Sequence, residues 1–400
     1  MILIKKIKYG IYVKVINMIN RMILNETAYF GSGAINAIVD EINKRGFTKA
    51  LVVTDKDLIK FSVATRITDL LAQNGLDYEV YDRVIPNPTV EVVHAGVTAF
   101  RRAGADYLIA VGGGSPQDTC KAIGMMIANP EFTDVRMLEG GAATRHPSVP
   151  IIAVPTTSGT AAEVTINYVI TDEEKKRKFV CYDPHDIPAI AIIDPDMMAS
   201  MPASLKAATG VDALTHAIEG FITRGAWELT DMFHLKAIEI IGRSLRDSVK
   251  GVSAGVADMA LGQYIAGMGF SNVGLGLVHG MAHPLGAFYG TPHGIANAVL
   301  LPHIMAFNAE YTGEKYRDIA HALGIKGAYE CSLSEARTLA IDAVTRLNRD
   351  IGIPLKLRDI GMRVEDAAAL AAAAYDDICT GGNPRECSVE MIKSLYLELF

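Results

Sequence analysis

Two pairs of side chains in this sequence have the spacing of metal ligands on a helix. Asp212 and His216 lie four residues apart in GVDALTHAIEG, and His279 and His283 lie four apart in HGMAH. Four residues advance an α-helix by about 6 Å, so each pair projects from one helix face and could place two ligands on one ion. HGMAH differs from the HExxH motif of zinc proteases, because Gly280 replaces the general-base glutamate that their mechanism needs.

One carboxylate and three imidazoles could complete such a site. Asp212, His216 and His279 would be joined either by His283 or by His293, which follows in TPHG. This nitrogen-rich set suits Zn²⁺ or Fe²⁺, and the ligand types do not choose between them. The alternative is that the histidines are core residues bonded to backbone carbonyls. For a single histidine, a core position bonded to a backbone carbonyl is the better interpretation. For a set of clustered histidines in charge-free surroundings, a metal site is the better interpretation.

The histidine cluster lies in a long uncharged segment. Residues 259–309 contain no Asp, Glu, Lys or Arg. Glycines, three prolines and several polar residues interrupt this segment, which disfavours a membrane-spanning helix and predicts buried helices around a polar centre. Five other histidines stand in charged or loop surroundings and are predicted to lie on the surface: His94, His146, His185, His234 and His321.

A glycine-rich turn indicates a nucleotide phosphate site. In YLIAVGGGSPQDTCKAIG a predicted strand runs into Gly112, Gly113, Gly114 and Ser115, and a helix opens with Pro116 in its first turn. Glycines allow backbone amides to approach a ligand closely, and the helix N-terminus favours an anion. The alternative is a tight strand–helix turn without a ligand. The segment is not a GxGxxG fingerprint, and GSGAIN (31–36) is predicted to be a helix-start turn.

A second turn and one carboxylate extend the nucleotide hypothesis. PTTSGTAAEV (155–164) follows an apolar run and is predicted to precede a helix, so Thr156, Thr157 and Thr160 could hold ribose or phosphate. Asp55 ends the predicted strand ALVVTD, where a carboxylate can bind the adenosine ribose and disfavour a 2′-phosphate. This favours NAD over NADP, although a solvated aspartate at a strand end is equally common.

The elements that must position these residues follow two patterns. Helical segments at 89–104 and 115–129 alternate with apolar runs up to about residue 200, and helical patterns alone follow. We therefore expect a parallel sheet covered on both faces and then an all-helical region. The predicted buried strands are ALVVTD (50–55), YEVYD (78–82), YLIAVGG (107–113), VPIIAVP (149–155) and AIAIID (189–194). The predicted divisions are an N-terminal extension (1–21), an α/β domain (22–201) and a helical domain (202–400).

Composition excludes several classes of protein. The 400 residues carry 38 Lys+Arg against 45 Asp+Glu, a net charge of −7, so nucleic-acid binding is disfavoured. Five scattered cysteines form no CxxC pair, which predicts neither a disulfide framework nor a thiolate zinc site and favours the reducing cytoplasm. Lysines interrupt the first twenty residues, so we expect a non-secretory extension with Met18 or Met22 as alternative starts, or else an additional edge strand.

Five motifs in this order resemble those of the iron-containing (group III) alcohol dehydrogenase family. They are GGGSPQD, PTTSGTAAE, GVDALTHAIE, GLGLVHGMAHPLGA and TPHGIANA, and the resemblance runs from about residue 22 to the C-terminus. It implies a dehydroquinate synthase-like fold, in which an N-terminal α/β dinucleotide-binding domain with a parallel sheet precedes an all-α C-terminal domain. The active site would lie in the cleft between them. The N-terminal extension departs from the family pattern.

The resemblance also implies roles for particular residues. The metal, Fe²⁺ or alternatively Zn²⁺, would be held by Asp212, His216, His279 and His293, with His283 unligated but adjacent. Residues implied to bind NAD are Asp55, Gly112, Gly113, Gly114, Ser115, Asp118, Thr156, Thr157, Thr160, Asn167 and Lys178. Residues implied to line a narrow substrate pocket are Asn167, Phe270 and Cys379. A homodimer without nucleic-acid or membrane partners is expected.

The expected activity is the metal-dependent interconversion of short alcohols and aldehydes with NAD(H). His283 is the candidate proton relay, since imidazole titrates in the useful range, and a structural role for it is an equal alternative. Rival hypotheses are a zinc polyol dehydrogenase of the glycerol type, a dehydroquinate synthase-like lyase and a non-catalytic descendant. A lyase of that kind needs several cationic side chains in its pocket, and residues 259–309 supply none.

Overall fold

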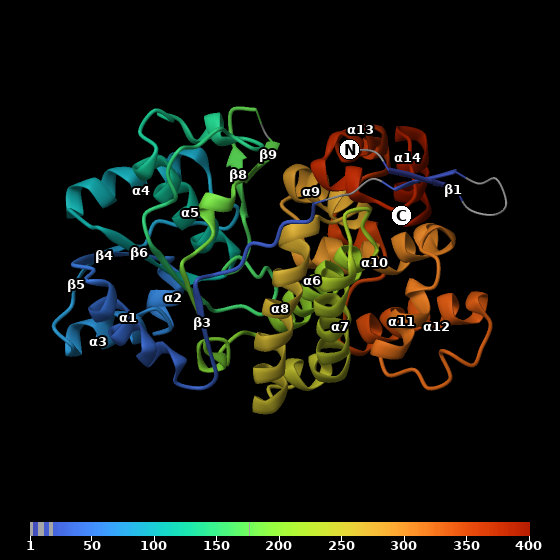
Figure 1. Ribbon diagram of the computed structural model, residues 1–400, viewed down its shortest axis with the longest axis horizontal. Coiled ribbons are helices and arrows are strands. Elements are labelled where there is room, and N and C mark those ends of the chain that lie inside the picture. Colours follow the sequence, from blue (N-terminus) through green and yellow to red (C-terminus); the bar gives the residue numbers. More distant parts are fainter. Residues whose placement is uncertain (1–2, 7–11, 16–18, 176) are drawn as a thin grey trace.

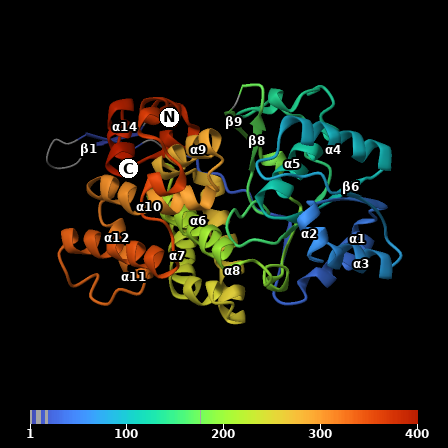
Figure 2. The ribbon, with the colours of Figure 1, turned by 180° about the vertical axis from the view of Figure 1, so that it is seen from behind.

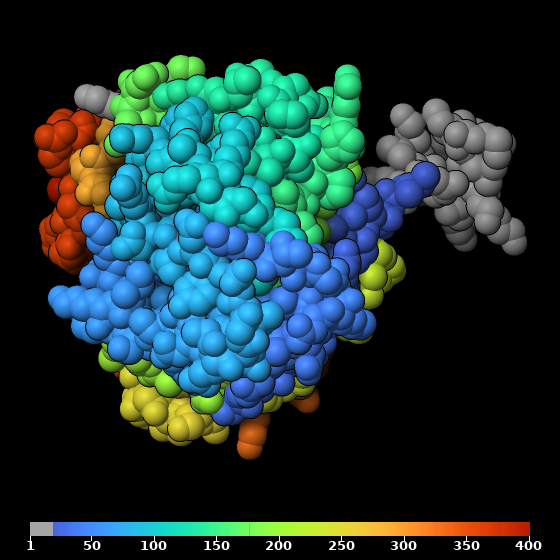
Figure 3. Space-filling model, turned by 90° about the vertical axis from the view of Figure 1, so that its left-hand side faces the viewer, coloured from blue at the N-terminus to red at the C-terminus, as the bar shows by residue number. Residues whose placement is uncertain are grey.

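A computed structural model describes residues 3–6, 12–15, 19–175 and 177–400. The chain forms an α/β half and a helical half that lie side by side (Figure 1), and the view from behind shows the same division (Figure 2). In Figure 3 the α/β half faces the viewer, and parts of the chain coloured blue to green make up most of the visible face. The predicted fold class, a parallel-sheet α/β region followed by a helical region, is confirmed.

Six parallel strands form the central sheet of the α/β half. Their order is β3 (Thr27–Phe30), β10 (Ile190–Ile193), β7 (Ile151–Pro155), β6 (Tyr107–Gly112), β4 (Lys49–Val53) and β5 (Asp77–Tyr81). All five predicted strands are therefore present, and β3 is an additional strand at the edge. The helices of this half are α1 (Ala37–Arg45), α2 (Lys56–Lys60), α3 (Thr65–Gln73), α4 (Val90–Ala103) and α5 (Gly114–Ala128).

The central strands are apolar on both faces because helices cover both. Leu51 and Val53 of β4 pack with residues of α4 and α5, whereas the alternating Ala50 and Val52 pack with residues of α1 and α3. Successive side chains of a strand point to opposite faces, so a strand buried on both sides appears in sequence as an unbroken apolar run. The carboxyl ends of β4, β6 and β7 then lead into Asp55, the glycine turn and the threonine turn at one edge of the sheet.

Two antiparallel hairpins lie outside this sheet. They are β1 (Leu3–Lys6) with β2 (Tyr12–Val15), and β8 (Asn167–Asp172) with β9 (Arg177–Tyr182). Within the described residues β1 and β2 pair with each other, so the expected additional strand does not join the large sheet. Met18, one of the two alternative starts, lies outside the described residues.

The helix predicted after the threonine turn is wrong. Residues 156–166 form turns, and the extended strand β8 follows them. Val164, Thr165 and Ile166 are β-branched, and such side chains favour an extended backbone over a helix. Ala161 also takes a left-handed conformation with φ of 52°, which interrupts any helix there.

The helical half begins with α6 and continues to the C-terminus. Its helices are α6 (Ala203–Ile222), α7 (Glu228–Val249), α8 (Ser253–Val273), α9 (Leu277–Tyr289), α10 (His293–Asn308), α11 (Lys315–Ala322), α12 (Leu333–Asp350), α13 (Ala367–Asp376) and α14 (Val389–Glu398). Single turns of 3-10 helix occur at Ala34–Asn36, Val135–Leu138, Pro184–Asp186, Pro195–Met197, Ala309–Tyr311, Leu357–Ile360, Val364–Asp366 and Ile378–Gly382. The uncharged segment forms most of α8 and all of α9 and α10. In the described parts of the chain, no helix is both long and apolar enough to cross a bilayer.

The prediction that His234 lies on the surface is wrong. His234 is fully buried on α7, and its ring packs against Gly220 of α6 and Gly269 of α8, where a Cβ atom would overlap it. Neither ring nitrogen has a hydrogen-bond partner among the described residues, and burial lowers the pKa of His234 to about 3. Gly220 and Gly269, which are distant in the sequence, leave room for the ring. The charged residues beside His234 in the sequence give no indication of this packing.

Candidate functional site

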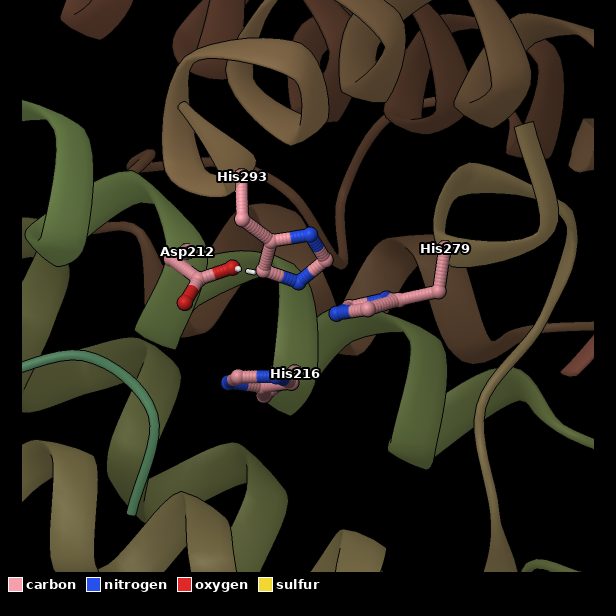
Figure 4. A group of neighbouring side chains, drawn as sticks. All are labelled: Asp212, His216, His279 and His293. Carbon is pink, nitrogen blue, oxygen red and sulfur yellow. Dashed lines mark ion pairs between the residues drawn. The ribbon is translucent and has the colours of Figure 1, made fainter. Parts of the chain in front are cut away.

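Four side chains from three helices converge in the helical half. Asp212 and His216 project from α6, His279 from α9 and His293 from the first turn of α10 (Figure 4). One potential ligand atom from each lies within 4.8 Å of those of the other three. His293, rather than His283, therefore completes the group. The spacing of Asp212 and His216 places both on one face of α6, as predicted.

Fixed hydrogen bonds orient two of these rings. The Nδ1 atom of His216 lies 3.2 Å from the carbonyl oxygen of Gly159, and a carbonyl only accepts, so Nδ1 carries the proton. The Nδ1 atom of His279 lies 2.6 Å from Oε2 of Glu219, and the other carboxylate oxygen, Oε1, accepts from the backbone N–H of Val278. A carboxylate or carbonyl behind each ring fixes the tautomer that leaves Nε2 for a metal.

Sequence reasoning missed Glu219. Burial raises the pKa of its carboxyl to about 8, and hydrogen bonds from the backbone N–H groups of Val278 and His279 oppose that rise. A buried carboxylate held between two helix elements next to a ligand-type histidine is typical of a metal site. The sequence feature that could have indicated Glu219 is its position three residues after His216, in AIEGFI (217–222), where the other residues are apolar or glycine.

An amide donor faces the inner side of the cluster. The Nδ2 atom of Asn297 lies 2.7 Å from Oδ1 of Asp212 and 3.1 Å from Nε2 of both His279 and His293. An NH₂ group only donates, so both Nε2 atoms present lone pairs, and its two hydrogens cannot satisfy three acceptors. Burial lowers the pKa of His216, His279 and His293, which keeps the imidazoles in the neutral form that binds metals. This excess of converging lone pairs fits a cation.

His283 lies beside this cluster in a separate dyad. Its Nδ1 atom is 2.8 Å from Oδ2 of Asp377, and its ring stacks against that of His293 with centroids 5.3 Å apart. Burial opposes ionisation of Asp377, but His283 and the backbone N–H of Cys379 lower the pKa of Asp377 overall. The proximity predicted for His283 is therefore present, and Asp377 is a second residue that the sequence did not indicate.

Gly280 has a packing role in the HGMAH motif. A Cβ atom there would overlap the hydroxyl of Thr380, which donates to the carbonyl of Ala374 at 2.6 Å. The 3-10 turn Ile378–Gly382 therefore packs against α9. Its residue Cys379 lines the cavity together with His283. Burial raises the pKa of the Cys379 thiol well above its usual value, so this wall of the cavity is uncharged.

One cavity joins the cluster to the glycine-rich turn. Sequence-predicted residues that line it are Gly114, Ser115, Asp118, Thr160, Asn167, Lys178, Asp212, His216, Phe270, His279, His283, His293 and Cys379. Phe270 stacks on the ring of His216, with centroids 4.2 Å apart and planes 13° apart. These thirteen residues, drawn from the metal, cofactor and substrate predictions, thus meet in one space, although they are spread over more than 260 positions of the chain.

The two predicted cofactor turns pack against each other. An ideal Cβ atom on Gly113 would lie 3.1 Å from Thr157, and one on Gly114 would lie 3.0 Å from Thr160. Gly112 has a φ of 154°, and a Cβ there would overlap Pro116. Larger side chains would press on Pro116, Thr157 or Thr160, so the glycines let the two turns pack closely at the N-terminus of α5, a position that suits a pyrophosphate.

Five predicted cofactor residues do not line the cavity: Asp55, Gly112, Gly113, Thr156 and Thr157. Asp55 caps α2 by accepting a hydrogen bond from the backbone N–H of Leu58 at 2.9 Å. It lies just after the carboxyl end of β4, at the expected edge of the sheet.

Asn87 is a cavity residue that sequence reasoning missed. It lines the cavity next to Pro88, has a φ of 57°, and its Oδ1 accepts from Nζ of Lys178 at 2.7 Å. Burial lowers the pKa of Lys178. An asparagine before a proline in IPNPTV was the available signal, since asparagine tolerates this conformation better than most residues.

Comparison with known proteins gives matches along nearly the whole chain. The family model described as iron-containing alcohol dehydrogenase matches residues 25–195, and its C-terminal counterpart matches residues 206–400. The chain is 66% identical over 379 residues to a lactaldehyde reductase of Escherichia coli (strain K12), which covers 95% of this chain and 99% of that protein. It is 41% identical over 376 residues to a 1,3-propanediol dehydrogenase of Klebsiella pneumoniae, covering 93% and 96%.

Solved structures have the same fold. A crystal structure of a 1,3-propanediol oxidoreductase superposes with a TM-score of 0.92 at 40% identity, over 96% of this chain and 100% of that chain. A sulfoacetaldehyde reductase from Bifidobacterium kashiwanohense in complex with NAD+ superposes with a TM-score of 0.86 at 27% identity, over 96% and 99%. These similarities extend across both halves of the molecule.

Proposed function

The chain belongs to the iron-containing alcohol dehydrogenase family, and we propose that it interconverts lactaldehyde and 1,2-propanediol with NAD(H). It is an oxidoreductase that acts on the CH–OH group of alcohols and on the corresponding aldehydes. The identity of 66% to a lactaldehyde reductase over nearly the full length supports this substrate. The observation that carries the proposal is the single cavity that holds both the converging donors and the glycine-rich turn.

The α/β wall of the cavity would hold the cofactor. The amides of the glycine-rich turn and the N-terminus of α5 would bind the pyrophosphate, with Thr160 on the neighbouring turn. Lys178 and Asn87 would hold the nicotinamide half, and the carboxylate of Asp55 would bind the adenosine ribose and disfavour NADP. Nicotinamide supplies the hydride chemistry, while the protein supplies placement and charge.

The helical wall would hold the metal. Asp212, His216, His279 and His293 would bind Fe²⁺, with Zn²⁺ as the alternative. When bound, such an ion supplies a Lewis acid that lowers the pKa of an alcohol and polarises an aldehyde carbonyl. The buried carboxylate of Glu219 and the carbonyl of Gly159 would keep His279 and His216 oriented for that role.

His283 would move the proton. Its bond to Asp377 fixes Nδ1, which leaves Nε2 as the atom that exchanges a proton with the substrate hydroxyl. The alternative is that His283 only supports the ring of His293. Phe270 and Cys379 would narrow the cavity so that short substrates fit, because a bulky ring and an uncharged thiol occupy its walls.

The family resemblance and the composition support a homodimer in the cytoplasm. All five cysteines are free thiols, as a reducing compartment would keep them. A small molecule is the substrate.

The rival lyase is less consistent with the cavity. A phosphorylated, carboxylated substrate needs several cationic partners, and Lys178 is the single Lys or Arg among the described residues that line it. The similarity to alcohol dehydrogenases likewise favours the oxidoreductase. A zinc polyol dehydrogenase would use the same donors with another metal and substrate.

The test is steady-state oxidation of NADH by the iron-loaded enzyme with lactaldehyde, dihydroxyacetone and a series of longer aldehydes. We expect the highest kcat/KM for lactaldehyde, and a lower one with NADPH in place of NADH. A higher kcat/KM for dihydroxyacetone would favour the polyol dehydrogenase. Bound metal without reduction of any aldehyde would contradict the proposal.

A further inference from the structure

The β8–β9 hairpin forms a wall of the cavity without belonging to the main sheet. Asn167, Val169 and Thr171 of β8 line the cavity, as do Lys178 and Val180 of β9. These are alternate positions on two paired strands, so one face of the hairpin points into the cavity. In Figures 1 and 2 the hairpin stands between the two halves of the molecule, beside α5. Contacts other than the hydrogen bonds of the sheet must therefore hold it in place.

A buried lysine on α5 supplies such contacts. Lys121 is fully buried, and its Nζ donates to the carbonyl oxygen of Thr165 at 2.6 Å, to Oγ1 of Thr165 at 2.8 Å and to the carbonyl oxygen of Asn167 at 2.9 Å. An ammonium group has three hydrogens, and each of these has an oxygen acceptor on the segment that enters β8. Hydrogen bonds from a charged donor are stronger than those between neutral groups.

Asp118, one turn earlier on α5, continues the same pattern. Its Oδ2 accepts from the backbone N–H of Val169 at 3.0 Å. The backbone groups of residues 165, 167 and 169 are thus bonded to two side chains of a single helix. The same helix begins at the glycine-rich turn, so α5 links the cradle for the pyrophosphate to the wall that carries Asn167.

Within the described residues, the Nζ atom of Lys121 bonds to Thr165 and Asn167 rather than to a carboxylate. Asp186, Asp118 and Glu163 are close enough to favour the charged form against the burial that lowers the pKa of Lys121. Neither carboxylate oxygen of Asp186 has a hydrogen-bond partner among the described residues. The hydrogens of Lys121 are instead all directed at the segment that enters β8.

From this geometry we propose that Lys121 is a positioning residue, which holds the β8–β9 hairpin against α5 and so sets the place of Asn167 and Lys178 in the cavity. It touches neither substrate nor cofactor and acts through the backbone of residues 165–169. This inference rests on the proposed function for its effect on binding. The contact itself does not depend on that function.

The test compares Lys121→Met with Lys206→Met. Lys206 is a matched control, because it is also buried and does not line the cavity. Within the described part of the chain its Nζ donates to a single carbonyl, that of Ala199, at 3.0 Å. Both variants should lower the Tm. Only Lys121→Met should raise the Kd for NADH and the KM for aldehyde, by about ten-fold, because a hydrogen bond to a charged group contributes that much.

The kcat of Lys121→Met at saturating substrates should change by less than about three-fold, since the residue acts on binding rather than on proton or hydride transfer. In the ligand-free protein, amide hydrogens of residues 165–172 should exchange faster in Lys121→Met than in Lys206→Met. Unchanged Kd and exchange in folded Lys121→Met would overturn the proposal.

Thr165→Val serves as the second variant if Lys121→Met does not fold. It removes one of three acceptors and should raise the Kd for NADH by about three-fold, with faster exchange in the same segment. Unchanged values for Thr165→Val would also overturn the proposal. If the wild-type enzyme bound no NADH, the proposed function would fail, while the exchange experiment would still test the contact.

Discussion

The two walls of the cavity are built in different ways. The helical wall takes its four metal-type donors from α6, α9 and α10, and three of them are buried. The α/β wall consists of two turns and a hairpin. Lys121 and Asp118 bond the hairpin to α5, and Thr160 packs against Gly114. Regular helices fix donors by their own periodicity, whereas turns depend on contacts with distant segments. The helical wall should therefore lose function when a single ligand is removed, and the α/β wall should lose it gradually.

The largest effect should follow from removing a ligand. Asp212→Ala should abolish tight metal binding and lower kcat by about a thousand-fold, because Lewis-acid stabilisation contributes several kcal/mol. Metal analysis and steady-state kinetics measure both. His303→Ala is the control, an exposed histidine on α10 outside the cluster, and it should keep both properties. Normal metal content in Asp212→Ala would remove this residue from the ligand set.

His283→Ala should lower kcat by about a hundred-fold with metal content unchanged, as expected for loss of a general acid–base group. Loss of metal would instead make His283 a ligand, and an unchanged kcat would leave it a purely structural role beside His293.

Glu219→Gln tests the support behind His279. We expect metal affinity to fall by about ten-fold, as for other residues that orient a ligand from behind. Competition with a chelator measures the affinity, and Glu239→Gln, at a half-buried position on α7 outside the cluster, is the control. If the affinity stayed the same, the hydrogen bond to Nδ1 of His279 would have no part in metal binding.

Phe270→Ala should broaden the substrate range. The KM for aldehydes longer than lactaldehyde should fall by about ten-fold, since each buried methylene group contributes on that order. Phe288→Ala, an exposed ring on α9, is the control. Because Phe270 stacks on His216, metal content must be checked alongside. An unaltered preference for short chains would contradict the proposed role.

The smallest effect should come from Asp55→Asn on the α/β wall. The ratio of kcat/KM for NAD to that for NADP should fall by about three- to ten-fold, through loss of a charge that repels the 2′-phosphate. Asp57→Asn, exposed on the same short helix, is the control and should leave the ratio unchanged. An identical ratio in both variants would exclude Asp55 from cofactor selection.

The same contrast explains what could be predicted from the sequence. Asp212 and His216 were recognisable because helical spacing alone places them on one face of α6, whereas the spacing of His279 and His283 indicated a pair of which only His279 joins the cluster. The strands were recognisable because burial on both faces leaves unbroken apolar runs. Both patterns depend only on residues close together in the sequence, so they can be read without knowledge of the tertiary contacts.

Non-local contacts were not recognisable. His234 was assigned to the surface because the glycines that receive it, Gly220 and Gly269, lie on other helices. In place of the helix expected after the threonine turn, the chain leads into strand β8. Lys121 of α5 hydrogen-bonds to this segment at Thr165 and Asn167. Glu219, Asn87 and Asp377 act through partners up to 94 residues away, and the nearby sequence does not reveal such pairings.

The central claim is that the four converging donors bind a metal needed for hydride transfer in the same cavity. The most direct test is the metal content of anaerobically purified protein, paired with NADH-dependent reduction of lactaldehyde before and after chelation. The account predicts about one ion per chain, as four ligands imply, with activity lost on chelation and restored by Fe²⁺. Full activity in metal-free protein, or no metal after careful loading, would contradict it.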